Sequence, residues 1–579
     1  MLEIVALLCG AAVMTLEMTG SRLLAPYLGA SVLVWTALIG VILACLSAGY
    51  WLGGKLADRA PTARKLAGLI LASAFCVLLT GAFQAGLLSS LAGLGLRPEI
   101  GASLAAIMLF GPASLLLGMV SPYVVRVAIQ QRKTPVEKAG TLIGRFGALS
   151  ALGSIIGTFL GGFIFISWVG SRLTVYLIAA TLIAAAVITL ISAGLKWRDG
   201  KLAFVMPLFA LLTCGLLTLT QIVTQLAEAE AGLISVDTRY SRVDIYDAPQ
   251  GFVPVTTDDA ADPSAGQSNR TGLATRTIER KLRQLYTPPN LLQSAMFTDA
   301  PNQLALNYTK HYALAWQLRP QAERFLMLGG AGYSVPKYLL STRKNIQLDV
   351  VEIDPDMTRL AHAYFGLQDD PRLTVRHEDA RTYLNRYAAA RAMNSSAPGG
   401  SGIQADAVIA SRESLVAPGY QIIMGDTFSS AYNIPFQLAT VECAEKIYAA
   451  LDEDGVFISN IISAVSGEKS ELLRSIHASF AQVFPEVRVF PLAVGNPTFP
   501  QNIMLVAFKT PARLPGAENL MAGGPLPWLA ADHPEEARAE LAAAAYMLRG
   551  EWKMRDTDAL PPLRDDFAPV ERYALSLLR

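Results

Sequence analysis

The residues best suited to chemistry in this 579-residue chain are a glycine-rich turn and an acid that follows it. The turn is Gly329-Gly330-Ala331-Gly332, and Glu352 lies 20 residues beyond Gly332. A carboxylate at this spacing can accept hydrogen bonds from both hydroxyls of a ribose, while the glycines let the backbone approach a nucleotide. The spacing therefore predicts ligand binding. The structural alternative is that a tight strand-to-helix turn needs glycine anyway.

Two further acids occupy comparable places. Asp379 follows the apolar run 372–376, in the stretch His377-Glu378-Asp379-Ala380, and Asp426 follows the run 420–424. An acid at the first place can accept a hydrogen bond from the exocyclic amine of adenine. Acids at the carboxyl ends of successive strands mark the crevice where open α/β sheets bind ligands. Any one of them taken singly is equally well explained as a helix cap.

Alternating strands and a helix must position these residues. Short apolar runs at Arg324–Leu328 and Leu348–Ile353 predict strands, and Val335–Ser341 between them predicts a helix. This β-turn-α-β unit has the spacing of a nucleotide-binding fold. Upstream, the alternation in Val236–Tyr246 predicts another strand, and Asn302–Gln317 is expected to be helical towards its end.

The chain before residue 227 has a different composition. Overall, 52% of residues are hydrophobic and 16% charged, with a mean hydropathy of +0.37, whereas soluble chains carry about a quarter charged residues. Because a spanning helix needs about 20 mostly apolar residues, we expect a polytopic α-helical membrane bundle of about seven helices. Pro112 and Pro122 are expected to kink the fourth. The segments are Ile4–Leu24, Val32–Leu52, Leu66–Leu88, Ser103–Val125, Leu142–Trp168, Thr174–Leu195 and Ala203–Gln225.

Lysine and arginine in the short loops predict the orientation of the bundle. The 2–3, 4–5 and 6–7 loops carry eleven of them, and the opposite loops carry only Arg97 and Arg172. This bias predicts a bundle in the cell (inner) membrane with its N-terminus on the cytoplasmic side. Seven crossings then place the following domain outside. The eleven are Lys55, Arg59, Arg64, Lys65, Arg126, Arg132, Lys133, Lys138, Lys196, Arg198 and Lys201.

Two features inside the apolar half stand out. Glu17 lies about 20 Å along the first helix, where an unpaired charge is costly. It is interpreted either as a structural hydrogen bond or as a proton or cation site. Gly153, Gly157 and Gly161 repeat every four residues and predict close packing of a neighbouring helix. The loop 53–59 resembles a cytoplasmic loop of major-facilitator transporters, which keeps transport as the minority hypothesis.

Several motifs together resemble spermidine synthase (polyamine aminopropyltransferase), and more closely its membrane-fused homologues, in which a helical membrane domain precedes the transferase-like domain. Leu563–Glu571 is similar to the closing motif of that group. The resemblance covers roughly residues 235–510 and 561–573. The other motifs are GGAGYS at 329–334, VEIDP at 351–355, PRLTVRHEDAR at 371–381, GDTF at 425–428 and IPFQLAT at 434–440.

The resemblance implies an α/β Rossmann-like domain of the S-adenosylmethionine-dependent methyltransferase type. It also implies transfer of an aminopropyl group from decarboxylated S-adenosylmethionine; ordinary S-adenosylmethionine is the other candidate co-substrate, and no metal is expected. By motif, Glu352 would hold the ribose, and Asp379 and Ala380 the adenine. The residues expected at the methionine-derived end are Gly329, Gly330 and Gly332.

On the acceptor side, the resemblance implies that Asp426 is the base, as the first residue of the family's D-S-x-D gate. Pro435 would correspond to the closing proline of that gate. Tyr308 begins the counterpart of the family's Tyr-His-Glu stretch, which here reads Tyr308-Thr309-Lys310. Both lie on the expected substrate side.

Departures from the family are concentrated where it binds cationic amines. Gly332 replaces the aspartate of the turn that pairs with the aminopropyl ammonium, and Ser429 or Ser430 replaces the second aspartate of the gate. Ser241 stands where the family has a glutamine. Contacts to adenosine are thus kept and contacts to a dication are largely lost, which puts transfer to putrescine in doubt.

Four segments are expected: a transmembrane domain at 1–226, a small β-rich part at 227–320, a Rossmann-like domain at 321–510 and a helical tail at 511–579. Polar insertions are expected at 247–276 and 394–402.

Three hypotheses follow: a membrane-bound transferase acting on a small amine or other small-molecule acceptor, a transporter or binding protein with a sensing domain, and a scaffold without catalysis. Besides the acceptor, a lipid bilayer and a second copy of the chain are expected partners, and nucleic acid is not.

Overall fold

The computed structural model describes the chain except residues 29–31, 60, 95, 133–138, 194–200, 231, 249–280, 288–290, 396–417, 428–434, 494, 556–559 and 578–579. Most of both predicted insertions therefore lies outside the described residues, as do Lys133, Lys138, Lys196 and Arg198. The chain forms two compact units. One is Met1–Ile245 with Thr287–Leu291, and the other is Tyr246–Tyr286 with Leu292–Arg579.

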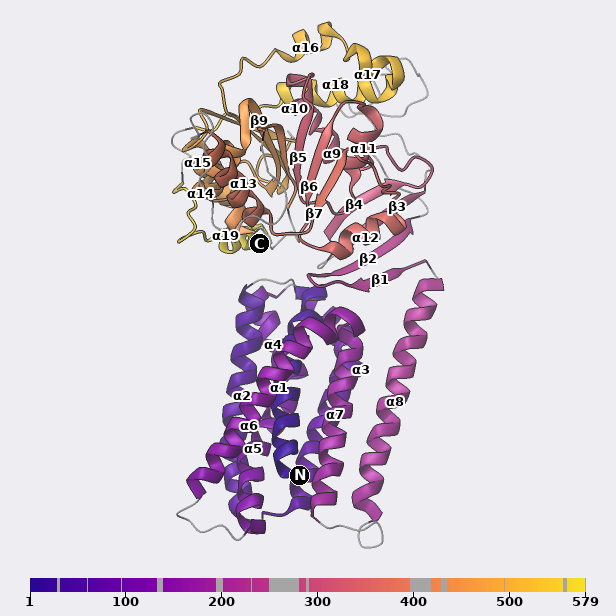
Figure 1. Cartoon of the computed structure of the whole chain (residues 1–579), viewed down its shortest axis with the longest axis vertical. Coiled ribbons are helices and arrows are strands. Elements are labelled where there is room, and N and C mark those ends of the chain that lie inside the picture. Colours follow the sequence, from indigo (N-terminus) through magenta and orange to yellow (C-terminus); the bar gives the residue numbers. More distant parts are fainter. Residues whose placement is uncertain are drawn as a thin grey trace. The chain divides into compact units, whose positions relative to one another are not determined.

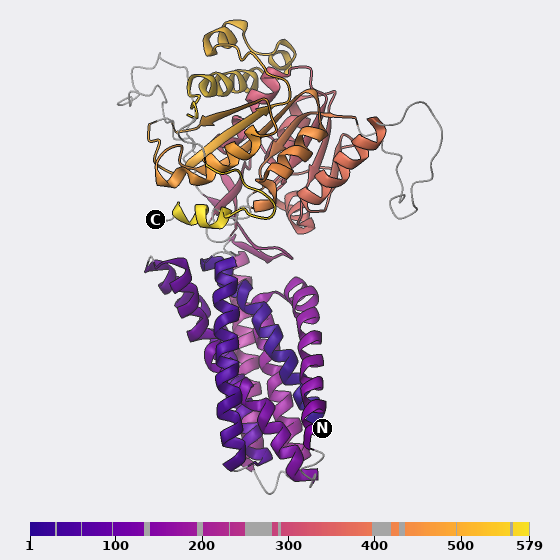
Figure 2. The ribbon, with the colours of Figure 1, turned by 90° about the vertical axis from the view of Figure 1, so that its left-hand side faces the viewer.

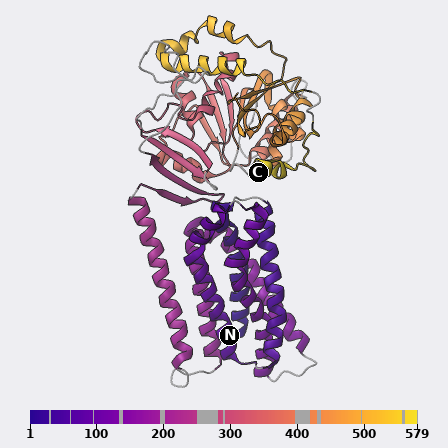
Figure 3. The ribbon, with the colours of Figure 1, turned by 180° about the vertical axis from the view of Figure 1, so that it is seen from behind.

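The first unit is a helical bundle whose helices run side by side (Figure 1 and Figure 2). Seven helices in its described residues are long and apolar enough to cross a membrane, by length and composition, which matches the predicted number. The last of them lies at the edge of the bundle, packed on α7 and α3 (Figure 3). The helices are α1 (Leu2–Leu28), α2 (Val32–Arg59), α3 (Ala63–Gly93), α4 (Pro98–Leu109), α5 (Gly111–Arg132), α6 (Ala139–Phe159), the π-helical η2 (Leu160–Val169), α7 (Ser171–Ser192) and α8 (Lys201–Glu230).

The predicted fourth segment, Ser103–Val125, is wrong as a single helix. It is divided at Phe110 into α4, with 12 residues, and α5, with 22 residues. Pro112 is the second residue of α5 and has no N–H to donate to the preceding turn, which accounts for a break at this place. Pro122, in contrast, lies inside α5 without ending it.

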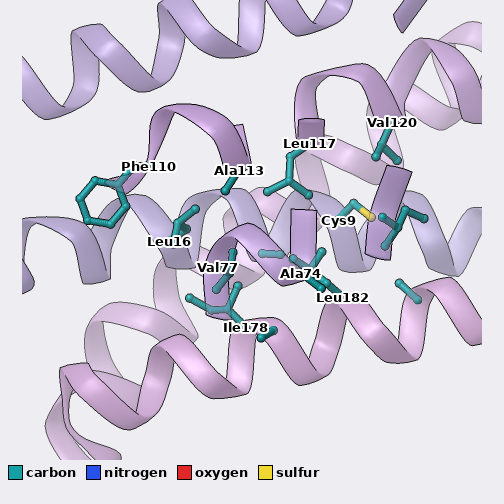
Figure 4. Packing of buried hydrophobic residues seen from close by; sticks show 14 of the residues in the cluster. Cys9, Leu16, Ala74, Val77, Phe110, Ala113, Leu117, Val120, Ile178 and Leu182 are labelled. Carbon is teal, nitrogen blue, oxygen red and sulfur yellow. The ribbon is translucent and has the colours of Figure 1, made fainter. Parts of the chain in front are cut away.

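Glycines set the closest contacts of the bundle, as the four-residue repeat predicted. A Cβ atom on Gly153 would lie 2.0 Å from the carbonyl oxygen of Leu7, and one on Gly157 would lie 2.3 Å from that of Ala11. Helices α1 and α6 can therefore approach this closely only because Gly153 and Gly157 lack side chains. Elsewhere the interior is filled by apolar side chains from several helices, which Figure 4 shows for the cluster containing Leu16.

Polar contacts identify the two ends of this bundle. At the Met1 end, Glu3 pairs with Arg132 at 2.8 Å and with Arg145 at 3.0 Å. At the other end, Asp237 accepts hydrogen bonds from the backbone N–H and the hydroxyl of Ser171, both at 2.8 Å. Strand β1, which ends at Asp237, thus lies at the end of the bundle away from Met1. Seven passages of the chain along the first unit would give this arrangement.

A four-stranded sheet has the order β1-β2-β3-β4. The single strand predicted at Val236–Tyr246 is wrong in one respect, because a turn closed by Thr238 and Ser241 divides it into β1 and β2. The expected helix before residue 317 is confirmed as α9 (Asn307–Lys310) and α10 (Ala313–Leu318). The strands are β1 (Ile234–Asp237), β2 (Arg242–Ala248), β3 (Leu282–Thr287) and β4 (Leu291–Phe297).

The second unit contains a mixed seven-stranded sheet of order β10-β11-β9-β8-β5-β6-β7, which confirms the predicted α/β class. Strands β5 to β9 are parallel, and β10 and β11 are antiparallel. The order reverses between β5 and β8, which makes the space beyond their carboxyl ends the topological switch point where such sheets bind ligands. The strands are β5 (Arg324–Leu328), β6 (Gln347–Val351), β7 (Leu373–Arg376), β8 (Tyr420–Gly425), β9 (Leu451–Ser463), β10 (Glu486–Pro491) and β11 (Gln501–Phe508).

Helices join the parallel strands and bury their apolar faces in the core. The predicted helix after the glycine turn is confirmed as α11. Helix α12 begins with Asp354 as its cap, whose side chain accepts from the N–H of Asp356 at 3.0 Å. The helices are α11 (Ser334–Thr342), α12 (Pro355–Tyr364), α13 (Ala380–Ser395), α14 (Val441–Ala450), α15 (Glu471–Ala481), α16 (Ala517–Gly523), α17 (Pro527–Asp532), α18 (Pro534–Arg549) and α19 (Val570–Ser576).

Candidate functional site

The glycine turn connects β5 to α11 and is packed too tightly for side chains. Gly329 has φ +90°, and a Cβ atom there would lie 2.2 Å from the carbonyl oxygen of Asp426. At Gly330 the same atom would lie 2.7 Å from the ring of Tyr333. Ala331 and Tyr333 also have positive φ, at 44° and 54°, a conformation that costs non-glycine residues energy and concentrates at functional sites.

Glu352 follows β6 and meets the turn, as the spacing predicted. Its Oε2 accepts hydrogen bonds from the N–H groups of Gly330 at 2.8 Å and Ala331 at 3.1 Å, and its Oε1 accepts from Asp354 N–H at 2.9 Å. Only 7% of Glu352 is exposed. A carboxylate has about four acceptor sites, so this one holds the shape of the turn and keeps capacity for a ligand hydroxyl.

Gly332 contacts a residue that the sequence analysis missed. Its N–H donates to the hydroxyl of Ser294 on β4 at 2.9 Å, and a Cβ atom on Gly332 would lie 2.7 Å from the Cβ of Ser294. The aspartate that the resembled family has at this place would not fit here. Ser294 precedes the turn by 38 residues in the sequence and belongs to none of the motifs, so only the fold reveals the contact.

A short chain of hydrogen bonds leads from the turn to the end of β7. The hydroxyl of Tyr333 lies 2.7 Å from Oγ1 of Thr358, and that oxygen lies 3.0 Å from Nε2 of His377. Tyr333 is completely buried, and burial raises its pKa above the ordinary value. The neutral tyrosine therefore serves as a structural support that links the turn to α12.

Asp379 and Ala380 lie at the start of α13. Oδ1 of Asp379 accepts from the N–H of Thr382 at 2.9 Å and from its hydroxyl at 3.2 Å, which is the geometry of a helix cap. Ala380, the first residue of the helix, is buried. One oxygen of Asp379 thus acts as a helix cap. The contact between Asp379 and adenine stays a prediction.

Asp426 directly follows β8 and forms the second polar centre of the site. Its Oδ2 accepts from the hydroxyl of Tyr308 at 2.8 Å, and its Oδ1 accepts from Nδ2 of Asn460 on β9 at 3.5 Å. Burial raises the pKa of Asp426 to about 6, although the hydrogen bonds from Tyr308 and Asn460 lower it. A carboxyl group poised near neutrality is suited to general acid–base work.

Tyr308, Tyr312 and Asn460 complete this centre. Burial, followed by the charge of Asp426, raises the pKa of Tyr308 well above its ordinary value, so its hydroxyl stays a donor. Tyr312 donates to the carbonyl of Gly425 at 2.6 Å. Asn460 has Oδ1 buried without a partner among the described residues, which costs about 1–3 kcal/mol when nothing binds there. Sequence analysis found Tyr308 but not Tyr312 or Asn460.

Pro435 immediately precedes a short helical turn, Phe436–Leu438. Residues 428–434, which connect it to Asp426 and include Ser429 and Ser430, lie outside the described residues. The predicted gate on the acceptor side therefore stays a prediction.

The closing motif holds the starts of two helices together. Asp565 accepts from the hydroxyl of Thr440 at 2.7 Å and pairs with Arg381 at 2.7 Å. Leu563 is 1% exposed, and its carbonyl accepts from the N–H of Val441 at 2.9 Å. The motif is therefore structural support for α13 and α14. Within the described ranges, no three His, Cys, Asp or Glu side chains cluster as metal ligands.

Part of this chain is similar in sequence to polyamine aminopropyltransferases. It is 29% identical to the enzyme of Vibrio vulnificus strain CMCP6 over 179 residues, which is 31% of this chain and 49% of the relative. With the enzyme of Streptococcus uberis it shares 28% identity over 220 residues, or 37% of this chain and 65% of the relative. The chain thus spans less than two thirds of either relative.

A solved structure of a probable spermidine synthase from Corynebacterium glutamicum ATCC 13032 is also similar. It shares 18% identity with a TM-score of 0.34, covering 50% of this chain and 84% of that one. No family model matches the chain.

Proposed function

We propose that the chain is a membrane-bound, spermidine synthase-like transferase that uses an S-adenosyl co-substrate. The observation that carries the proposal is that two carboxylates flank one switch point. Glu352 is bonded to the glycine turn after β5, and Asp426 follows the adjacent strand β8. The sequence similarity to polyamine aminopropyltransferases supports the same class of reaction.

Glu352 and the turn would hold the adenosyl end, with the remaining acceptor site of the carboxylate on a ribose hydroxyl. In aminopropyl transfer, Asp426 accepts one proton from the entering ammonium. The freed nitrogen lone pair then forms a bond to the carbon next to the sulfonium. The carbon–sulfur bond breaks with its electron pair on sulfur, and a neutral thioether leaves.

Turnover by the full-length chain tests this proposal and identifies the transferred group. The purified chain is incubated with an amine mixture and either decarboxylated or ordinary S-adenosylmethionine. Aminopropyl transfer leaves 5′-methylthioadenosine, whereas methyl transfer leaves S-adenosylhomocysteine. Release of neither product, from a chain that keeps its cooperative unfolding transition, contradicts a transferase and favours the scaffold.

For the first unit, we propose a multi-pass bundle in the cell (inner) membrane with the N-terminus in the cytoplasm. The basic residues Arg126, Arg132 and Arg145 lie at the Met1 end and support this orientation. An adenosyl co-substrate is cytoplasmic, whereas this orientation puts β1 outside. A reporter that is active only in the periplasm, fused after Arg579, shows on which side the domain lies. High activity supports the orientation predicted from the charge bias and contradicts the transferase.

The alternative function is a transporter or binding protein whose synthase-like domain senses a ligand. The observation that favours it is Glu17, an acid that is 7% exposed inside an apolar bundle. Uptake assays that compare Glu17→Gln with the wild type test this alternative. Unchanged uptake would contradict a proton or cation site at Glu17.

A further inference from the structure

The hydroxyl groups around Asp426 have used up their hydrogen-bond donors. The hydroxyl of Tyr308 donates to Asp426 at 2.8 Å. The hydroxyls of Tyr312 and Ser459 both donate to the carbonyl of Gly425, at 2.6 Å and 3.1 Å. Each hydroxyl has one proton to give, so none of the three has a donor left for a ligand.

Acceptors, in contrast, are in surplus at the same place. Asn460 is 3% exposed, and its Nδ2 points to Oδ1 of Asp426 at 3.5 Å. Because an ionised carboxylate only accepts, the amide must present its nitrogen to Asp426 and its oxygen away from it. That oxygen has no partner among the residues that the structure describes. A buried acceptor of this kind needs a donor, and a bound ligand can supply one.

The charge of this cluster limits what the ligand can be. Asp426 contributes one negative charge, and among the described residues no other acidic side chain hydrogen-bonds to Tyr308, Tyr312, Ser459 or Asn460. Lys310 stands two residues after Tyr308, where the resembled family has a glutamate. A second cation on the ligand would lack a counter-charge here and would be desolvated at a cost.

Building on the proposed function, we infer that the acceptor is a primary amine with a single positive charge, and that Asn460 binds it. Asp426 accepts one N–H of the ammonium, and Oδ1 of Asn460 accepts a second. A diamine of the same length is disfavoured because its second cation has no partner. An alcohol is disfavoured because its single proton cannot satisfy both acceptors.

Calorimetry on the full-length chain in lipid nanodiscs tests this inference, with the chain saturated by whichever product it binds, 5′-methylthioadenosine or S-adenosylhomocysteine. The ligands are three of equal length: n-butylamine, 1,4-diaminobutane and 1-butanol. We expect n-butylamine to bind at least about tenfold more tightly than either other ligand, the effect of one hydrogen bond to a charged group. Equal or tighter binding of the diamine or of the alcohol overturns the inference.

Variants of Asn460 separate binding from support of the fold. Asn460→Leu removes the acceptor and should weaken n-butylamine binding about tenfold, whereas Asn460→Gln should stay within about threefold of the wild type. Asn460→Asp should move the preference towards 1,4-diaminobutane. Unchanged amine binding in Asn460→Leu contradicts the inference.

Binding of the product, 5′-methylthioadenosine or S-adenosylhomocysteine, distinguishes this failure from that of the proposed function. Its affinity should be the same in the wild type and in all three variants, which also shows that they are folded. If the wild type binds neither of these products, the proposed function is wrong and this inference falls with it. If it binds while the three acceptors are not discriminated, only the inference is wrong.

Discussion

Glu352 and Asp426 follow β6 and β8, the two strands that flank β5, yet their surroundings differ. Glu352 accepts from three backbone N–H groups, whereas Asp426 accepts from two side chains, one of them at 3.5 Å. Backbone donors are held by the fold, so Glu352 is rigidly placed. Asp426 has fewer partners, so burial is the dominant influence and raises its pKa to about 6.

The difference shows how one fold assigns two roles to the same chemical group. A carboxylate held by backbone donors orders a binding turn, while a buried one with few donors can exchange a proton near neutral pH. We therefore assign the adenosyl side to Glu352 and proton transfer to Asp426. The predictions below test this division.

The largest effect is expected from Asp426→Asn. The amide cannot take up the proton of the acceptor, so turnover should fall by about 10²–10⁴-fold. Affinity for the adenosyl co-substrate should stay within about threefold of the wild type. Rapid-quench turnover with calorimetry as its control measures both. Full turnover in this variant would remove Asp426 as the base.

The pH profile should show the second largest effect. Below pH 6 Asp426 becomes protonated and cannot accept a proton, so the turnover rate should fall about tenfold for each further pH unit. Above pH 6 the ionised form dominates and this acidic limb is absent. Turnover measured at saturating co-substrate between pH 5 and 8 checks the sign. A rate that rises as the pH falls would contradict the assignment.

Tyr308→Phe sharpens the same assignment. Since the hydrogen bond from Tyr308 lowers the pKa of Asp426, its loss should move the acidic limb to higher pH. The phenylalanine keeps the ring, and we expect a loss of turnover of about tenfold at pH 6 that becomes smaller at pH 8. A limb that stays in place would show that this bond does not tune Asp426.

The smallest effect is expected at the turn, from Gly332→Ala. The added Cβ would lie 2.7 Å from that of Ser294, and overpacking of this kind costs about 1–3 kcal/mol of unfolding free energy. Ser294→Gly in the same chain should restore most of the loss. Denaturant unfolding of both single variants and the double variant measures the coupling, and additive effects would contradict the contact.

Local patterns predicted much of this arrangement. The glycine turn, Glu352 and Asp426 follow from strand ends and spacing, because parallel strands bring their carboxyl ends to one edge. Ser294, Tyr312 and Asn460 escaped prediction because they come from other elements and carry no motif. Their places depend on which strands become neighbours, and the sequence pattern does not specify that order.

Other differences have local physical causes. Asp379 makes cap hydrogen bonds to Thr382, and a cap and an adenine contact have the same sequence signal. The break at Phe110 depends on how the bundle accommodates Pro112, since the similar Pro122 leaves α5 continuous. Apolar composition gives the number of long helices but does not locate an interruption within one of them.

The most direct test of the central claim is calorimetric titration of decarboxylated and of ordinary S-adenosylmethionine into the full-length chain. We predict that the wild type binds at least one of them and that Glu352→Ala binds it about a hundredfold more weakly, because the ribose contacts and the shape of the turn are lost together. Glu323→Ala, at an exposed residue just before β5, is the matched control and should bind as the wild type does. Binding that is equal in all three proteins would contradict the account.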